Sequence, residues 1–126
     1  MFLFFNHTLT PSQQDDAKES FGVEEFVYLP ENLQNLWSNI PCDLEDLIYY
    51  LKPFEEFIHL NISEGDFVLI QGDFGACCYI KDVVESIGAT PLYATTERKS
   101  EEVLEGDKVV KRSVFRHVKF RRYPKK

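Results

Sequence analysis

The feature that most constrains this chain is a pair of short, wholly apolar runs. Residues 2–5 read FLFF and residues 67–70 read FVLI, and both runs end in a polar segment. An unbroken apolar run of this length is typical of a strand that is buried on both faces, as in a parallel sheet. The chain is therefore expected to alternate strands with helices.

A helix is expected to follow the first run. Thr10 is placed to cap it, Pro11 suits its first position, and Gln13 completes a capping box. The helix is expected to end at Gly22, ahead of a second strand over residues 25–29. A strand, a helix and a strand in this order make a βαβ unit.

Two helices are expected in the middle of the chain. A short one carries Leu33, Leu36 and Trp37 on one face and ends near Pro41. A longer one is expected to begin at Asp43, because apolar residues then recur at helical spacing: Leu44, Leu47, Ile48, Leu51, Phe54 and Ile58. Pro53 interrupts this pattern, so a kink or a break is expected there.

The second apolar run is expected to lead into a helix over residues 76–87 and a fourth strand over residues 91–96. The polar residues 97–106 predict a turn or a short helix. Residues 109–110 and 114–123 then indicate one or two antiparallel strands. The prediction is a single α/β domain over residues 1–126, with a Rossmann-like, mostly parallel sheet flanked by helices and a C-terminal antiparallel β extension.

Composition excludes several classes of protein. The chain has 126 residues, of which 44% are hydrophobic, so it can bury one core and is not disordered overall. Three cysteines make no disulfide framework, and no run approaches the roughly 18 apolar residues of a membrane span. A soluble, cytoplasmic protein that is not exported is expected.

Charge is distributed unevenly along the chain. The net charge is −7, which argues against a protein that simply coats DNA or a membrane. Residues 108–126 hold nine basic residues and no acidic one, so residues 1–107 carry a charge of −16. A basic segment on an acidic body suggests an anion, a nucleic acid or an acidic neighbouring subunit as a partner.

Three polar loops are expected at the carboxyl edge of the sheet, where ligands of open parallel sheets bind. They are residues 6–8, 71–75 and 95–98. In the second loop, Gly72 and Gly75 let the backbone approach a ligand, and the helix beginning near Ala76 points its free amides there. The loop matches neither the dinucleotide-binding nor the Walker A pattern, and the alternative is a turn without a ligand.

Individual side chains in these loops allow two interpretations each. Asp73 caps the following helix or binds a ribose hydroxyl or an adenine amino group. Thr95 and Thr96 donate hydroxyl groups to a ligand or merely end a strand. Arg98 binds an anion or is solvated. His7 acts as a general acid or base, or donates to a backbone carbonyl.

The remaining histidines and the basic segment carry weaker signals. His59 is expected to pack in the core or on the surface of a helix, and His117 is expected to lie in the basic strand. The three histidines lack the spacing of a metal site. The basic residues 111–126 protect an edge strand from aggregation, or form a positive rim around a polyanionic ligand, or complement an acidic second subunit.

With these residues in view, the chain resembles the small stand-alone ring nucleases of type III CRISPR systems, which contain little besides one CRISPR-associated Rossmann-like domain. The resemblance covers nearly the whole chain. Its specific parts are QGDFG at residues 71–75 and ATTxR at residues 94–98. Supporting parts are NHTLT at residues 6–10, the YLP, LQ and W of residues 28–37, and FRHVKFR at residues 115–121. Asn6 stands where the family usually has a serine.

The resemblance implies that the chain binds cyclic tetra-adenylate and cleaves it without a metal or a cofactor, as a homodimer with the ring across its two-fold axis. A ribose 2′-hydroxyl attacks the adjacent phosphate and leaves di-adenylate with a 2′,3′-cyclic phosphate. The candidate catalytic residues are His7, Arg98 and Asp73. The candidate ligand-binding residues are Asn6, Thr8, Gln71, Gly72, Phe74, Gly75, Ala76, Thr95 and Thr96.

Two other functions remain open at this stage. The chain could bind the same messenger without cleaving it, as a sponge. It could instead be a structural partner whose basic strand docks on an acidic protein surface, which predicts no nucleotide binding. Neither a membrane nor a long nucleic acid is expected as a partner.

Overall fold

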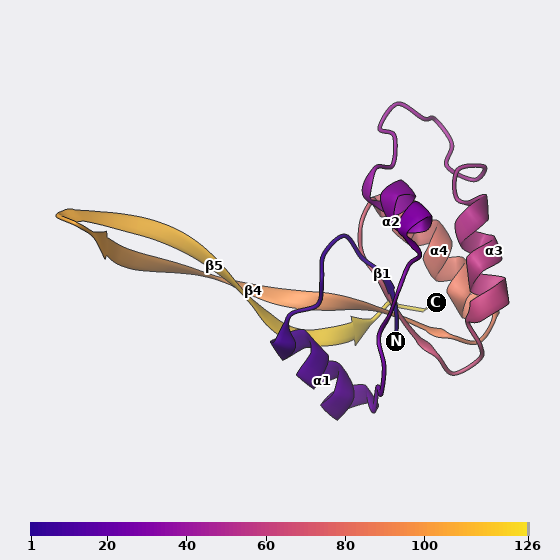
Figure 1. The fold of residues 1–126 in the computed structure, drawn as a ribbon, viewed down its shortest axis with the longest axis horizontal. Helices are drawn as coiled ribbons and strands as arrows, with labels where there is room; N and C mark the ends of the chain where they lie inside the picture. Colours follow the sequence, from indigo (N-terminus) through magenta and orange to yellow (C-terminus); the bar gives the residue numbers. More distant parts are fainter. Residues whose placement is uncertain (126) are drawn as a thin grey trace.

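The computed structural model describes residues 1–125. Figure 1 shows a body of strands and helices from which a long two-stranded arm projects. In chain order the elements are β1 (Phe2–Phe4), α1 (Pro11–Phe21), β2 (Val27–Tyr28), α2 (Glu31–Ser38), α3 (Lys52–Asn61), β3 (Phe67–Ile70), α4 (Phe74–Ser86), β4 (Thr90–Glu105) and β5 (Lys108–Arg122).

The strands form one sheet in the order β2-β1-β3-β4-β5. Strands β2, β1, β3 and β4 are parallel, and β5 is antiparallel to β4. The predicted fold class is therefore confirmed: an α/β sheet, mostly parallel, with an antiparallel C-terminal extension. The chain moves outward from β1 to β2 on one side and from β3 to β4 on the other, so the strand order reverses between β1 and β3.

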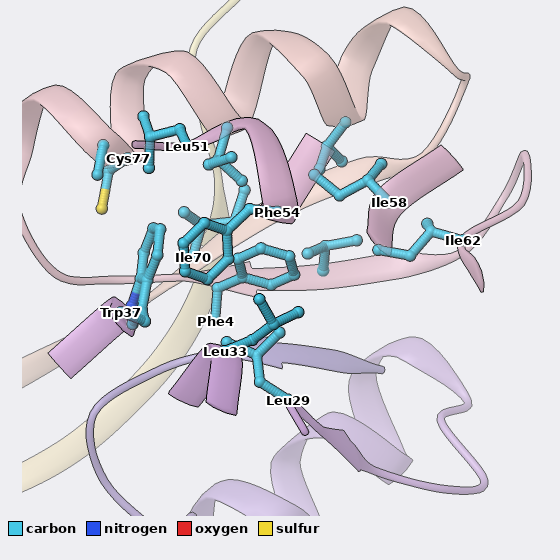
Figure 2. Packing of buried hydrophobic residues seen from close by; sticks show 14 of the residues in the cluster. Phe4, Leu29, Leu33, Trp37, Leu51, Phe54, Ile58, Ile62, Ile70 and Cys77 are labelled. Atoms are coloured by element: carbon cyan, nitrogen blue, oxygen red, sulfur yellow. The ribbon is translucent and has the colours of Figure 1, made fainter. Parts of the chain in front are cut away.

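Helices cover both faces of the sheet (Figure 1). Successive residues of β1 point to opposite faces. Leu3 packs in the cluster that includes α1, and Phe4 packs in the larger cluster under α2, α3 and α4. In Figure 2 the Phe4 ring lies among other aromatic rings, with centroids 5.4 Å from Trp37 and 6.1 Å from Phe54. Burial on both sides explains why the β1 sequence has no polar residue.

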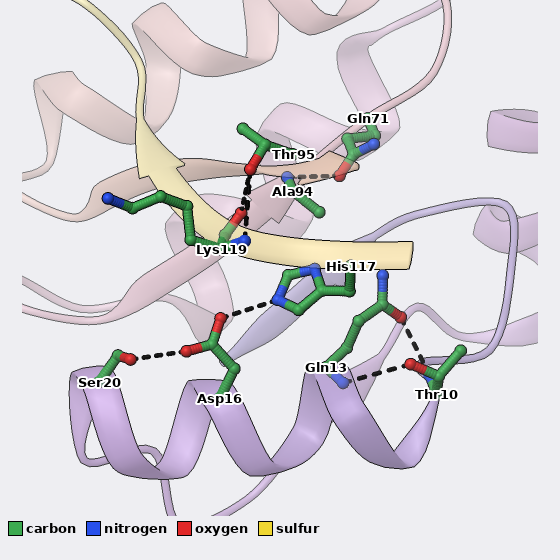
Figure 3. Close-up of polar contacts among 9 residues, drawn as sticks. All are labelled: Thr10, Gln13, Asp16, Ser20, Gln71, Ala94, Thr95, His117 and Lys119. Atoms are coloured by element: carbon green, nitrogen blue, oxygen red, sulfur yellow. Dashed lines mark hydrogen bonds and ion pairs between the residues drawn. The ribbon is translucent and has the colours of Figure 1, made fainter. Parts of the chain in front are cut away.

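The predicted boundaries of α1 are confirmed. Thr10 Oγ1 accepts from Gln13 N at 3.2 Å, and Gln13 Oε1 accepts from Thr10 N at 2.9 Å (Figure 3). Gly22 ends the helix in the left-handed conformation, with φ at 66°. Glycine adopts this conformation without the steric cost that a Cβ adds.

The long helix predicted from Asp43 to Ile58 is wrong in its first half. Helix α3 begins only at Lys52, and Pro53 lies in its first turn, where a missing N–H costs nothing. Leu44 and Ile48 are exposed, although their spacing placed them on the buried face. Residues 43–51 form turns and irregular backbone, because the proline disrupts an earlier helix but suits the start of a new one.

The turn or short helix predicted for residues 97–106 is also wrong. Strand β4 continues through them to Glu105, turns at Gly106 with φ at 62°, and returns as the one strand β5. Opposite charges face each other along this arm: Glu97 with Arg116, Glu101 with Arg112, Glu102 with Lys111, and Glu105 with Lys108. Such cross-strand pairs stabilise a hairpin, and a segment read on its own does not reveal them.

Candidate functional site

The reversal in strand order places a crevice between the carboxyl ends of β1 and β3. A cavity of about 180 Å³ lies there, lined by Phe5, Asn6, His7, Gln71 and Gly72. Parallel sheets bind ligands at such a point because the two crossover connections leave it in opposite directions. The structure thus brings together two of the three loops that the sequence singled out.

His7 is exposed and is a titratable side chain on this crevice. Its ring stands edge-on to Phe5, with centroids 5.4 Å apart. Asn6 beside it accepts a hydrogen bond from Ser38 Oγ at 3.1 Å, so α2 holds the loop. The imidazole is therefore positioned by packing and left open to a ligand.

A second hollow of about 380 Å³ continues the crevice toward β2 and α2. It shares Asn6 and His7 with the first, and Thr8, Tyr28 and Gln34 also line it. Gln34 Nε2 donates to the Phe5 carbonyl at 2.9 Å, which ties α2 to the end of β1. Thr8 thus lines the part of the predicted site that lies toward β2 and α2.

Gln71 has a structural task that sequence reasoning did not foresee. Its Oε1 accepts from Ala94 N at 2.7 Å (Figure 3), and its carbonyl accepts from Trp37 Nε1 at 3.0 Å. The side chain therefore links β3 to β4 beyond the point where their strand pairing ends. Gly72 lies against the same indole: a Cβ built on it would be 3.0 Å from Trp37 Nε1.

Asp73 caps α4, as one of its two interpretations predicted. Its Oδ2 accepts from Ala76 N at 3.0 Å, and its carbonyl accepts from Cys77 N at 2.9 Å. The first amides of a helix have no intrahelical partner, so those of Phe74 and Gly75 remain available to an anion. The helix start thus has amides that can accept an anion, whereas the Asp73 carboxylate itself is engaged in the cap.

Arg98 does not lie at the carboxyl end of a strand, because β4 continues for seven residues beyond it in the arm. Its Nε and Nη2 contact Ser113 Oγ at 3.2 and 2.8 Å, and its guanidinium lies 5.9 Å from the Phe115 ring centroid. It is four residues past Ala94, or about 13 Å along a strand. The arm therefore carries Arg98 away from the crevice.

Thr95 and Thr96 lie on β4 between Ala94, which contacts Gln71, and Arg98 on the arm. Thr95 Oγ1 donates to the Lys119 carbonyl at 3.0 Å (Figure 3), so this hydroxyl pairs β4 with β5. Thr96 is exposed and lies opposite His117. Lys119 and Arg121, toward the base of the arm, lie opposite Thr95 and Tyr93, so neither has an acidic residue opposite it.

His117 fastens the arm to the body. Its Nε2 lies 2.7 Å from Asp16 Oδ2 on α1 (Figure 3), and only 5% of its side chain is exposed. Burial alone would raise the pKa of Asp16, but hydrogen bonds with Ser20 and His117 outweigh it and lower the pKa below 3.8. The histidine that the sequence assigned to the basic strand therefore sets where the arm leaves the body.

A further hollow of about 620 Å³ lies on the α4 side of the crevice. Of its lining, the sequence singled out Gln71, Gly72 and Phe74, and the other residues were missed. The hollow shares Gln71 and Gly72 with the crevice, and is further lined by Phe74, Cys77, Cys78, Lys81, Tyr93, Tyr123 and Pro124. The residues come from α4, β4 and the end of β5, so no local motif marks them. The sequence feature that could have indicated this hollow is Tyr93, an aromatic residue close to the candidate ligand-binding residues Thr95 and Thr96.

The described residues contain neither a membrane-spanning helix nor a metal-binding cluster. None of the helices in residues 1–125 is long and apolar enough to cross a membrane. Within the same residues, no three His, Cys, Asp or Glu side chains are grouped so that they could hold a metal ion.

Comparison with known proteins places the chain in a family. The profile of the uncharacterized protein MJ1673 family matches residues 1–121. Uncharacterized protein MJ1673 of Methanocaldococcus jannaschii is 43% identical over 123 residues, which are 98% of this chain and 95% of that protein. No solved structure matches the chain. The chain therefore belongs to the uncharacterized protein MJ1673 family.

Proposed function

We propose that this protein is a ring nuclease that binds cyclic tetra-adenylate and cleaves it to linear di-adenylate, and so switches off type III CRISPR signalling in the cytoplasm. The observation that carries the proposal is the crevice between β1 and β3. It places His7 beside a glycine-bearing loop. Through the hollow that shares Gln71 and Gly72 with it, the crevice reaches Phe74 at the start of α4, where the first amides have no intrahelical partner. The resemblance to stand-alone ring nucleases supplies the substrate.

The reaction needs little from the protein, because the substrate brings its own nucleophile. The 2′-oxygen forms a bond to the adjacent phosphorus, and the bond from phosphorus to the 5′-oxygen of the next nucleotide breaks. His7 takes the proton of the 2′-hydroxyl or delivers one to the departing 5′-oxygen. Holding the ribose in line is worth about 7–11 kcal/mol in well-oriented reactions. Two such cleavages convert one ring into two di-adenylates with 2′,3′-cyclic phosphate ends.

A homodimer suits this reaction. Two crevices across a two-fold axis would present one His7 to each of two opposite phosphates of the ring. Arg98 lies on the arm, away from the crevice of its own subunit. In this scheme it contacts a phosphate of the ring that is bound in the crevice of the partner subunit. Positive side chains at the base of the arm, such as Lys119 and Arg121, would attract the polyanion.

The test is multiple turnover of the purified protein with radiolabelled cyclic tetra-adenylate in tenfold excess, in EDTA, followed by chromatography. We expect di-adenylate well beyond one ring per dimer. His7→Ala is expected to slow cleavage at least 100-fold, within the range for loss of a general acid or base. His59→Ala is the matched control, because His59 is exposed on α3. Full turnover by His7→Ala would refute the mechanism.

A sponge is the second candidate function, and one observation favours it. His7 is the titratable residue among those that line the crevice, while the Asp73 carboxylate is occupied by the helix cap. A site with so few free acid–base groups is suited to binding. Intact ring that co-elutes with the protein, with no product after prolonged incubation, would establish this function instead.

A further inference from the structure

The hollow on the α4 side of the crevice has the properties of a binding site. Its volume, about 620 Å³, falls within the range of small-molecule pockets. Gln71 and Gly72 line both this hollow and the crevice, so one ligand can occupy the two. Among the described residues that line it, Lys81 carries a charge and no acidic residue is present. Because Lys81 is ion-paired with Asp82 at 3.0 Å, the lining as a whole favours an apolar ligand.

Aromatic rings form one wall of the hollow. Tyr93 and Tyr123 pack edge to face, with centroids 5.0 Å apart, and the Tyr123 hydroxyl donates to the Ile70 carbonyl at 2.5 Å. This bond fixes the Tyr123 ring against the sheet. The Arg121 guanidinium lies over the Tyr93 ring, 4.9 Å from its centroid, as in a cation–π contact. Rigid aromatic rings backed by an arginine are a platform for a planar aromatic ligand.

The lining also includes an apolar side chain that is almost fully exposed. Phe74, the first residue of α4, is 95% exposed. Its backbone amide is one of the two that remain unpaired at the helix start. The same residue therefore offers a ring to a planar group and an N–H to an anion, separated by the length of its own side chain.

We infer that this hollow is a purine-base subsite: it receives the base of a nucleotide whose phosphate lies at the start of α4. A nucleotide joins a planar aromatic ring to an anion, and the hollow joins Phe74, Tyr93 and Tyr123 to the free amides. The identity of the base as adenine rests on the proposed function. The subsite itself stands on the lining, the exposed ring and its continuity with the crevice.

Two cysteines make this inference directly testable. Cys78 is exposed and lines the hollow, and Cys42 is exposed and lies outside it. Cys77 is buried, and burial raises its pKa to about 11, so it stays protonated and reacts slowly. Alkylation of the full-length protein with iodoacetamide, measured residue by residue by mass spectrometry, thus reports on the hollow and carries its own control.

The experiment compares alkylation rates without nucleotide, with 5′-AMP and with cyclic tetra-adenylate. We expect either nucleotide at saturation to slow modification of Cys78 at least fivefold and to leave Cys42 unchanged. Phe74→Ala is expected to weaken protection by 5′-AMP about tenfold, as for loss of one stacked base. Leu60→Ala, at an exposed apolar residue of α3, is the matched control and should change nothing.

The outcomes separate this inference from the proposed function. Ring cleavage with Cys78 unprotected would overturn the subsite and leave the nuclease intact. Protection of Cys78 by 5′-AMP without any ring cleavage would support the subsite and refute the nuclease. Protection that grows with protein concentration in the absence of nucleotide would overturn the subsite, because a second copy of the chain would then fill the hollow.

Discussion

Replacing Gly72 with alanine tests how tightly the crevice loop is built. Gly72 has φ at 158°, and a Cβ built on it would lie 3.0 Å from Trp37 Nε1 and 3.3 Å from Cε2. Trp37 is 1% exposed and holds the Gln71 carbonyl, so it has little room to move away. Overpacking a filled core costs about 1–3 kcal/mol, and an unfavourable backbone conformation costs a similar amount. We expect Gly72→Ala to lower the free energy of unfolding by about 3 kcal/mol.

Two other glycines separate these contributions. Gly65 has φ at 87° with open space around it, so Gly65→Ala should show the backbone cost alone, about 1–2 kcal/mol. Gly75 lies in the first turn of α4, and its Cβ would meet Asp73 Oδ2 at an ordinary 3.4 Å. Gly75→Ala should therefore leave stability unchanged or raise it by about 0.5–1 kcal/mol.

The assay is urea unfolding followed by the fluorescence of Trp37, the one tryptophan of the chain. A loss of about 3 kcal/mol would also lower the Tm by roughly 10 °C. If Gly72→Ala and Gly65→Ala unfolded at the same urea concentration, the contact with Trp37 would contribute nothing, and the reasoning about the loop would be refuted.

Three further predictions concern single side chains. Asp73→Asn should keep the α4 cap and ring cleavage, whereas Asp73→Ala should cost about 1 kcal/mol in urea unfolding; loss of cleavage in Asp73→Asn would show a catalytic role. The pKa of Asp16 is lowered from 3.8 in the folded protein, so the contribution of this carboxylate to stability is present above pH 3.8 and is lost as the pH falls through the lower, folded pKa. Thermal unfolding from pH 2 to 7 should therefore show the Tm values of wild type and Asp16→Asn converging in acid. A Tm difference that stays constant with pH would contradict this. Glu102→Lys places a lysine opposite a lysine in the arm and should speed amide hydrogen exchange there, unlike Glu56→Lys on α3. Equal exchange in both variants would show that the cross-strand charges do not stabilise the arm.

Several parts of the fold could be predicted because their causes are local. The apolar runs of β1 and β3 imply burial on two faces, and the capping box at Thr10 and Gln13 acts within one turn of chain. Gly22 ends α1 by its own conformational freedom. Asp73 caps α4 through an amide three residues away. The confirmed fold class follows from these local signals in their order along the chain.

Other parts could not be predicted, because their causes lie in distant residues. Leu44 and Ile48 have helical spacing but no surface to cover, so spacing alone misplaced the start of α3. The glutamates of β4 became strand residues because basic residues of β5 lie opposite them. This extension moved Arg98 from the edge of the sheet to the arm. The position of a side chain in a strand thus depended on a partner that the segment itself does not reveal.

The sequence by itself determined that β1 and β3 are buried on both faces, where α1 begins and ends, and that polar loops follow β1 and β3. Only the tertiary structure decided that β1 and β3 are neighbours, and thus that His7 and Gly72 share a crevice. It also brought Tyr93 and Tyr123 together beside Phe74. The physical reason is that capping and burial pattern act within a few residues, whereas strand order and pairing are settled by packing over the whole sheet.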